Sequence, residues 1–327
     1  MELMIRGLAF GAAALCAALI GFAIQRDATC TVTTVNQVVN QRKAARLVAL
    51  GEASLWVCAG LLAAHALHLA MRWPTGHALT VRTLAGAVLL GLGAYVNRAC
   101  VFGAIARFGS GEWVYALTPA GFYLGSLAAA RLDVGPGQAG VVAGADGFAA
   151  SPVAWIVAAA FAWRVGAACL RGRGALRDRA AARLWSPHAA TSVIGIAFLA
   201  MLLLVGAWAY TDALADLARG MTQGLPGRLL LAACLLAGAI VGGWTAGRLR
   251  ARRVEARAAL RCLAGGAMMG AGSLLIPGSN DGLILVGLPM LWPYAWVAFL
   301  VMCATIGIAL RIEARIADRW GGVVSTP

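Results

Sequence analysis

The chain has 327 residues, of which 61% are hydrophobic and 12% charged, and its mean hydropathy is +0.80. So little polar surface excludes a soluble domain of this length, because several apolar runs reach the roughly 20 residues that a helix needs to cross a bilayer. Membrane spans are either helices or a closed barrel, and these runs are continuous rather than alternating. The sequence therefore predicts an all-α polytopic membrane protein. The net charge of +14 does not indicate a nucleic-acid partner, since the cations lie in short loops between apolar runs.

Apolar segments are expected, in chain order, at residues 4–24, 29–40, 47–71, 81–96, 99–108, 113–131, 152–170, 189–210, 227–247, 260–275, 280–290 and 293–311. The segments 29–40, 99–108 and 280–290 are too short to cross alone. Segment 4–24 is interpreted as a retained membrane segment rather than a signal peptide, because no small-x-small cleavage site precedes Gln25.

Loop charges predict the orientation of these segments. The loops 41–46, 164–183 and 248–261 are rich in Arg and Lys, whereas 133–146 and 212–216 carry acids. The positive-inside rule places the basic loops in the cytoplasm. The prediction is a multi-pass protein of the bacterial inner (plasma) membrane with about nine crossings, its N-terminus outside and its C-terminus cytoplasmic.

A repeat with a constant spacing of 179 residues relates 84–132 to 263–311. Each copy has a glycine-rich apolar stretch, a polar interruption and a second short apolar stretch, and the two copies are expected to cross in opposite directions. This predicts an inverted repeat, with a first repeat at 1–148, a linking helix and basic loop at 149–188, and a second repeat at 189–327. Interrupted apolar segments at matching positions of two halves are typical of a transport site. A weaker similarity, with a spacing of 188 residues, sets Gly7, Ala9 and Phe10 against Gly195, Ala197 and Phe198, and Cys30 against Ala218.

The polar interruptions supply the candidate site residues. Cys100 and Ser279 occupy matching positions at the starts of two short helices, where free N–H groups and the helix dipole favour an anion. Cys30 begins a third short helix. The alternative is that glycines permit close helix packing and cysteines fill space, but polar groups at this depth are costly and usually functional. The predicted substrate path comprises Cys30, Arg98, Cys100, Ser279, Asn280 and Asp281, and the predicted helix-break glycines are Gly91, Gly93, Gly103, Gly270, Gly272, Gly278 and Gly282.

Two segments carry a family resemblance. GFAIQRDATCTVTTVNQVV (21–39) and GLGAYVNRACVFGAIARFGSGEW (91–113) resemble the YeeE/YedE sulphur-transport family, whose pattern covers roughly 1–312 and is sharp only in the first half. The resemblance implies an hourglass-shaped helical protein whose central cysteines, Cys30 and Cys100 by position, pass thiosulfate along by thiol hydrogen bonds. Its expected partners are a small sulfur-containing anion, the lipid bilayer and a small cytosolic sulfur-carrier protein of the TusA type.

The second half departs from the family pattern, because Ser279 stands where another cysteine is expected and Asp281 adds a carboxylate beside the anion path. Asp281 could cap the short helix, pair with Arg98, or take up a proton or cation for coupling. A permease for thiosulfate is the predicted function. The alternatives are a permease for a related oxyanion, and a membrane sulfur-relay protein or sulfurtransferase with a persulfide-forming cysteine. The sequence has no Walker A motif and no paired cysteine spacing, so we expect neither an enzyme, nor a cofactor, nor a metal site.

Overall fold

The computed structural model describes residues 2–69, 73, 74, 76–132, 148–170 and 185–321, and within these ranges the regular structure is helical, with no strand. Seven segments of this part of the chain are long and apolar enough to cross a membrane: Gly7–Gln41, Ala45–Ala66, Val81–Gly109, Pro187–Val205, Leu225–Thr245, Ala256–Leu275 and Pro293–Arg319. The prediction of an all-α polytopic membrane protein is confirmed. The acidic loop predicted at 133–146, and all but the first residues of the basic loop predicted at 164–183, lie outside the described residues.

In the first half, two long helices each stop at a break and continue as a short helix. Helix α1 (Glu2–Asp27) leads into α2 (Thr31–Gln41), and α4 (Val81–Asn97) leads into α5 (Val101–Gly109). Both breaks pass through a non-glycine residue with positive φ, Ala28 at 55° and Arg98 at 57°. The remaining helices of this half are α3 (Ala45–Ala66), η1 (Trp113–Ala116) and α6 (Leu117–Arg131), and α8 (Pro152–Leu170) follows them.

The second half has the same order of elements. Helix α10 (Pro187–Val205) leads into α11 (Tyr210–Ala218), and α13 (Ala256–Leu275) leads into α14 (Asn280–Gly282) and the π-helical η2 (Leu283–Gly287). Between and after them come α12 (Leu225–Thr245) and α15 (Pro293–Gly321). The prediction of one continuous segment over 189–210 is wrong, because the chain leaves the helix at Gly206, whose φ of 90° favours glycine.

All four breaks recur at one spacing. The N-cap residues of α2 and α5 are Cys30 and Cys100, and those of α11 and α14 are Ala209 and Ser279. Ala209 and Ser279 each stand 179 residues after their counterpart in the first half. The weaker pairing at 188 residues, which set Cys30 against Ala218, therefore does not describe the breaks.

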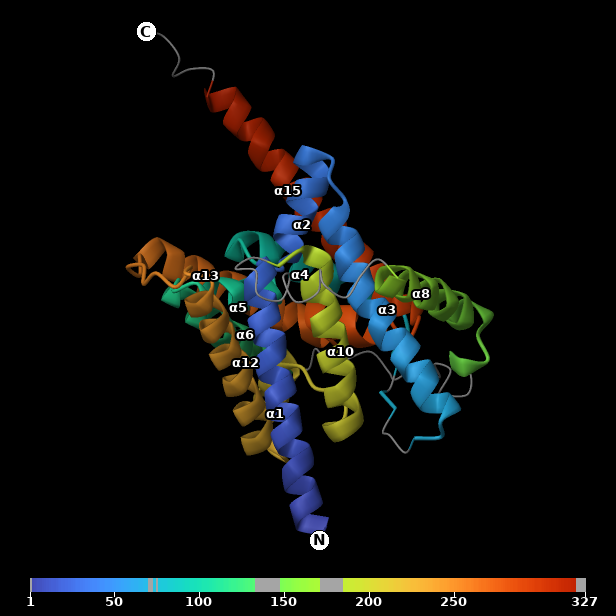
Figure 1. The fold of residues 1–327 in the computed structure, drawn as a ribbon. Coiled ribbons are helices and arrows are strands. Elements are labelled where there is room, and N and C mark those ends of the chain that lie inside the picture. Colours follow the sequence, from blue (N-terminus) through green and yellow to red (C-terminus); the bar gives the residue numbers. More distant parts are fainter. Residues whose placement is uncertain (1, 70–72, 75, 133–147, 171–184, 322–327) are drawn as a thin grey trace.

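Helix packing also repeats between the halves. Helix α1 packs against α12 as α10 packs against α3, and α6 packs against α13 as α15 packs against α4. Each of these pairs joins a helix of one half to a helix of the other, as do the repeat-related pairs α1–α10 and α4–α13. Figure 1 shows α1, α10 and α12 side by side, with α2 and the C-terminal end of α15 projecting at the top.

Glycines bring α4 and α13 into close contact. A Cβ added to Gly86 would lie 2.7 Å from the carbonyl oxygen of Gly272, and one added to Gly272 would lie 2.7 Å from that of Gly86. Gly93 and Gly265 have the same reciprocal relation at 2.7 Å. Small residues allow helix backbones to approach closely inside a membrane.

Four of the glycines predicted as break residues belong to these continuous helices. Gly91 and Gly93 lie within α4, and Gly270 and Gly272 lie within α13. An added Cβ on Gly91 would lie 2.8 Å from the Met302 carbonyl oxygen, and one on Gly270 would lie 2.0 Å from the Phe122 carbonyl oxygen of α6. These glycines therefore serve helix packing, which was the alternative interpretation.

Candidate substrate site

The starts of the four short helices meet in the interior and are linked by hydrogen bonds. The Thr31 N–H of α2 donates to Cys100 Sγ at 3.1 Å, and Asn280 Nδ2 of α14 donates to Thr31 Oγ1 at 3.1 Å. In α11, Thr211 Oγ1 lies 2.9 Å from each carboxylate oxygen of Asp281. The fold thus brings Cys30, Cys100, Ser279, Asn280 and Asp281 into one buried region.

Cys30 and Cys100 lie next to each other in this region. Cys30 is 5% exposed and Cys100 is 1% exposed. Neither side chain caps its own helix. Cys30 Sγ lies so close to Gly103 of α5 that a Cβ at Gly103 would overlap it. The two thiols therefore stand between the N-termini of α2 and α5, whose first N–H groups have no partner within the helix.

Asn97 holds the first break in shape. Its Nδ2 donates to the Ala99 carbonyl at 2.8 Å, and its Oδ1 accepts from Thr118 Oγ1 at 3.1 Å. The Asn97 carbonyl accepts from the Tyr115 hydroxyl at 3.3 Å. Because Asn97 is fully buried and bonded on both sides, it fixes the turn that presents Cys100.

The second break is polar and incompletely bonded. Ser279, Asn280 and Asp281 are between 1% and 4% exposed. Asp281 Oδ1 accepts the Gly282 N–H at 3.1 Å, in addition to its contact with Thr211. Ser279 Oγ lies beside the Asp281 carboxylate, yet neither it nor Asn280 Oδ1 makes a hydrogen bond of good geometry with any described residue.

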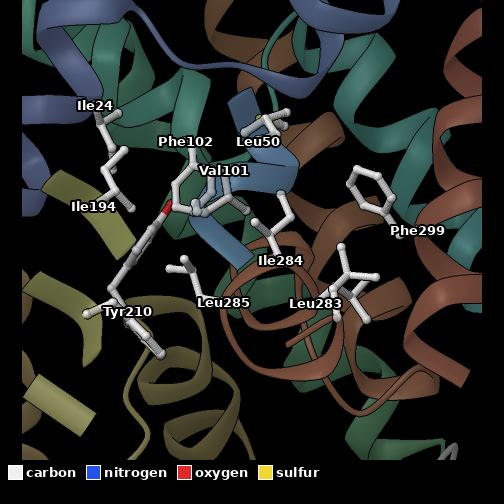
Figure 2. Packing of buried hydrophobic residues seen from close by; sticks show 14 of the residues in the cluster. Ile24, Leu50, Val101, Phe102, Ile194, Tyr210, Leu283, Ile284, Leu285 and Phe299 are labelled. Atoms are coloured by element: carbon white, nitrogen blue, oxygen red, sulfur yellow. The ribbon is translucent and has the colours of Figure 1, made fainter. Parts of the chain in front are cut away.

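A small cavity adjoins Asp281. Its polar lining residues are Trp208, Tyr210 and Asp281, and the rest of its wall is apolar, from Ile20, Ile24, Phe102, Ile105, Phe198, Met201, Ala209, Leu235 and Leu285. Figure 2 shows the Tyr210 hydroxyl directed toward Phe102, with Leu285 nearby. Trp208 Nε1 is buried without a hydrogen-bond partner among the described residues. Both halves of the chain therefore line the space beside the acid.

Arg98 lies away from this region. Its guanidinium donates to Glu313 of α15 at 3.1 Å, and its side chain is 60% exposed. The Tyr95 hydroxyl donates to the same carboxylate at 3.1 Å. The ion pair between Arg98 and Asp281 that the sequence left open is therefore not formed, because Arg98 caps α4 in a left-handed conformation and reaches α15 instead.

Sequence reasoning missed four residues of the site: Thr31, Trp208, Tyr210 and Thr211. Thr31 had a signal, since it is the first residue of the short helix that Cys30 begins. Trp208 lies in the break before α11, and Tyr210 and Thr211 are the first residues of α11; the apolar run that continues from α10 conceals this break.

A comparison with known families decides the class. The model of the Sulphur transport family matches residues 26–309. The chain belongs to this family. The match runs through all four breaks, from Cys30 to Ser279, and confirms the resemblance to YeeE/YedE proteins. Membership indicates a membrane transporter of sulfur compounds. No curated protein matches the chain.

This sulphur-transport protein has no evident metal site in the part of the chain that the structure describes, where no three His, Cys, Asp or Glu side chains are grouped to hold an ion.

Proposed function

We propose that the protein is an inner-membrane permease for a small sulfur-containing anion, with thiosulfate as the expected substrate. The observation that supports this is the pair of buried thiols, Cys30 and Cys100, at the N-termini of two short helices. Helix N-termini favour an anion, because their free N–H groups and the helix dipole point at it. Thiols are weak hydrogen-bond donors, suited to a soft terminal sulfur atom.

The hydrogen bond from Thr31 to Cys100 suggests how the anion is handed on. The Thr31 N–H donates to Cys100 Sγ, which is a weak acceptor. An entering anion is the stronger acceptor and takes over this N–H, since hydrogen bonds to charged groups are roughly twice as strong as neutral ones. Thiol hydrogen bonds are weak enough to break, so the anion leaves without a covalent step.

The thiol chemistry is confined to the first half. The matching N-caps of the second half are Ala209 and Ser279, which carry a methyl group and a hydroxyl. Substrate contacts on that side come from Ser279, Asn280 and the residues of the cavity beside Asp281. Arg98, bonded to Glu313 and largely exposed, is left out of the proposed path.

An inverted repeat with about nine crossings, an outer N-terminus and a cytoplasmic C-terminus belongs to the same proposal. The repeated packing of α1–α12 and α10–α3 supports it, as do the cations that follow α2 and α12. A cytosolic sulfur-carrier protein of the TusA type stays a prediction, as do the boundaries of the two repeats.

Uptake of radiolabelled thiosulfate into proteoliposomes, measured against sulfate, sulfite and selenite, tests the function. Thiosulfate should enter faster than the other anions. Equal entry of sulfate would indicate a general oxyanion permease, and a persulfide adduct on Cys30 or Cys100 in the mass spectrum would indicate a sulfur relay. No uptake above protein-free vesicles would contradict the proposal.

A further inference from the structure

Asp281 is the buried acid of the second break, and its partners are neutral. It is 4% exposed, and both carboxylate oxygens share the single hydroxyl of Thr211 at 2.9 Å. One hydroxyl has one hydrogen, so it can donate to only one of the two oxygens. Among the described residues, no Lys, Arg or His forms an ion pair with Asp281.

Two buried polar atoms without a hydrogen-bond partner belong to the same break as this carboxylate. Ser279 Oγ lies beside it, Asn280 Oδ1 belongs to the preceding residue, and both are buried without a hydrogen-bond partner in the described part of the chain. An ionised carboxylate can only accept hydrogen bonds, whereas a protonated carboxyl group can also donate one. With the carboxylate ionised, the Ser279 hydroxyl can only donate to it; with a proton on Asp281, the carboxyl group can donate to Ser279 Oγ instead.

The ionisable groups around Asp281 do not supply a free positive charge. Tyr210 and Asp212 face it from α11, and Cys100 faces Tyr210 from α5. Tyr294 of α15 lies close to Asp212. The cations near Asp212 are Arg219 and Arg228, and both form ion pairs with Asp216.

A substrate anion in the cavity would meet this acid directly, because Asp281 lines the cavity together with Trp208 and Tyr210. Like charges in apolar surroundings repel strongly, since little water screens them. The repulsion has to be removed before an anion can pass from the cavity to Cys100.

We propose that Asp281 takes up one proton with each substrate anion, so that transport is proton-coupled. The inference rests on the proposed function. The carboxylate accepts a proton from the outer side and becomes neutral, and the anion then moves past it to the thiols. The carboxyl group releases the same proton to the cytoplasmic side after the anion has left. No bond other than O–H forms or breaks, and no electron is transferred.

Proteoliposomes that contain the full chain and a trapped pH-sensitive dye test the coupling. Thiosulfate added outside should acidify the lumen of parent vesicles, and an inward proton gradient should raise the initial uptake rate several-fold. A protonophore should abolish the effect of the gradient. Uptake driven by a sodium gradient instead, or uptake without acidification, would overturn the inference.

The variant Asp281→Asn keeps the shape of the side chain but cannot take up a proton. It should lose accumulation driven by the proton gradient and retain exchange of labelled for unlabelled thiosulfate, which needs no net proton movement. Asp318→Asn makes the same change at an exposed carboxyl group of α15 and should behave like the parent. An Asp281→Asn protein that still couples uptake to protons, or that loses exchange while it remains folded by size-exclusion chromatography, would contradict the assignment. If that variant does not fold, the dye measurement on the parent decides.

The two proposals fail in different ways. Parent vesicles that exchange neither thiosulfate, sulfite nor sulfate would refute the permease and the coupling together. Parent vesicles that exchange thiosulfate but admit no proton with it would refute the coupling alone.

Discussion

At the scale of single residues, the position of the Cys30 thiol depends on the absence of a side chain at Gly103. Cys30 lies beside Cys100 because residue 103 has no side chain and leaves room for its sulfur atom. The matching glycine of the second half, Gly282, has nothing within 4 Å of an added Cβ. Gly103 and Gly282 occupy repeat-related positions, but only Gly103 leaves room for a neighbouring side chain. Alanine variants of the two glycines are therefore a matched pair.

Gly103→Ala should displace Cys30 and impair transport. Its Cβ would overlap Cys30 Sγ, and overpacking of this kind typically costs ~1–3 kcal/mol. We expect a loss of thiosulfate uptake together with a lower midpoint of thermal unfolding. Gly282→Ala is the control and should leave the unfolding midpoint unchanged. Equal behaviour of the two variants in both measurements would show that the space beside Cys30 is unimportant.

Cys100→Ala should reduce thiosulfate uptake by about tenfold or more, the effect of losing a contact worth ~1.4 kcal/mol in the rate-limiting complex. The variant should still fold, because alanine fits the space of a cysteine. Cys303→Ala is the control, since Cys303 is partly exposed within α15. Initial rates at matched protein amounts in proteoliposomes measure both. Near-parental uptake by Cys100→Ala would reduce this cysteine to a packing role.

The sequence was sufficient to place Cys30, Cys100 and Ser279 at helix starts, because a polar interruption between apolar runs is a local signal. The partner of Arg98 could not be predicted, since it depends on where α15 lies relative to the left-handed cap of α4. Thr211 was hidden for a similar reason: its role depends on a contact with Asp281, 70 residues away.

At the scale of elements, repeat-related glycines make equivalent contacts where α4 crosses α13. Gly86 meets Gly272, and the repeat-related positions, Gly265 and Gly93, meet in turn. These repeated glycines thus lie where the two helices cross, and not at the breaks that follow the helices. Their spacing predicted that the helices correspond, but only the packing shows that they touch.

Gly86→Ala and Gly265→Ala should destabilise the protein by similar amounts, ~1–3 kcal/mol each, because both press a Cβ against the facing backbone at 2.7 Å or less. Thermal unfolding in detergent measures the shift. Gly51→Ala in α3 is the control, as nothing lies within 4 Å of its added Cβ. If only one of the two repeat-related variants lowered the midpoint, the crossing would not be equivalent from both sides.

The break before α11 could not be predicted from hydropathy. The run from α10 continues through Trp208 and Ala209 without a charged residue, so a hydropathy reading joins it to the next helix. Gly206 alone marks the break, and an isolated glycine in an apolar membrane helix is too common to signal one.

At the scale of the whole molecule, the helix packing is repeated in the two halves, but the side chains at the helix breaks are not. The helix contacts between the two halves recur with the halves exchanged, yet the two thiols of the site belong to the first half and its buried acid to the second. Both groups lie in the one buried region where the four breaks meet. Which face of that region is open to the cytoplasm depends on the orientation of the helices.

Orientation is predicted from the ends of α12, which is 21 residues long and so spans ~31 Å, close to the thickness of the hydrocarbon core. The exposed Thr222 lies just before α12, and the two arginines near this end, Arg219 and Arg228, pair with Asp216. Four arginines follow the other end of the helix: Arg248, Arg250, Arg252 and Arg253. The positive-inside rule puts the second end in the cytoplasm.

A membrane-impermeant maleimide should therefore label Thr222→Cys in intact cells and Arg252→Cys only after permeabilisation. The parent chain, whose described cysteines are all buried or partly buried, supplies the background. Sites introduced at 135–145 and 172–180, outside the described residues, should report outside and cytoplasm in the same way. Labelling of Thr222→Cys and Arg252→Cys from one side would show that α12 does not cross the membrane. Labelling of Arg252→Cys in intact cells and of Thr222→Cys only after permeabilisation would show the opposite orientation.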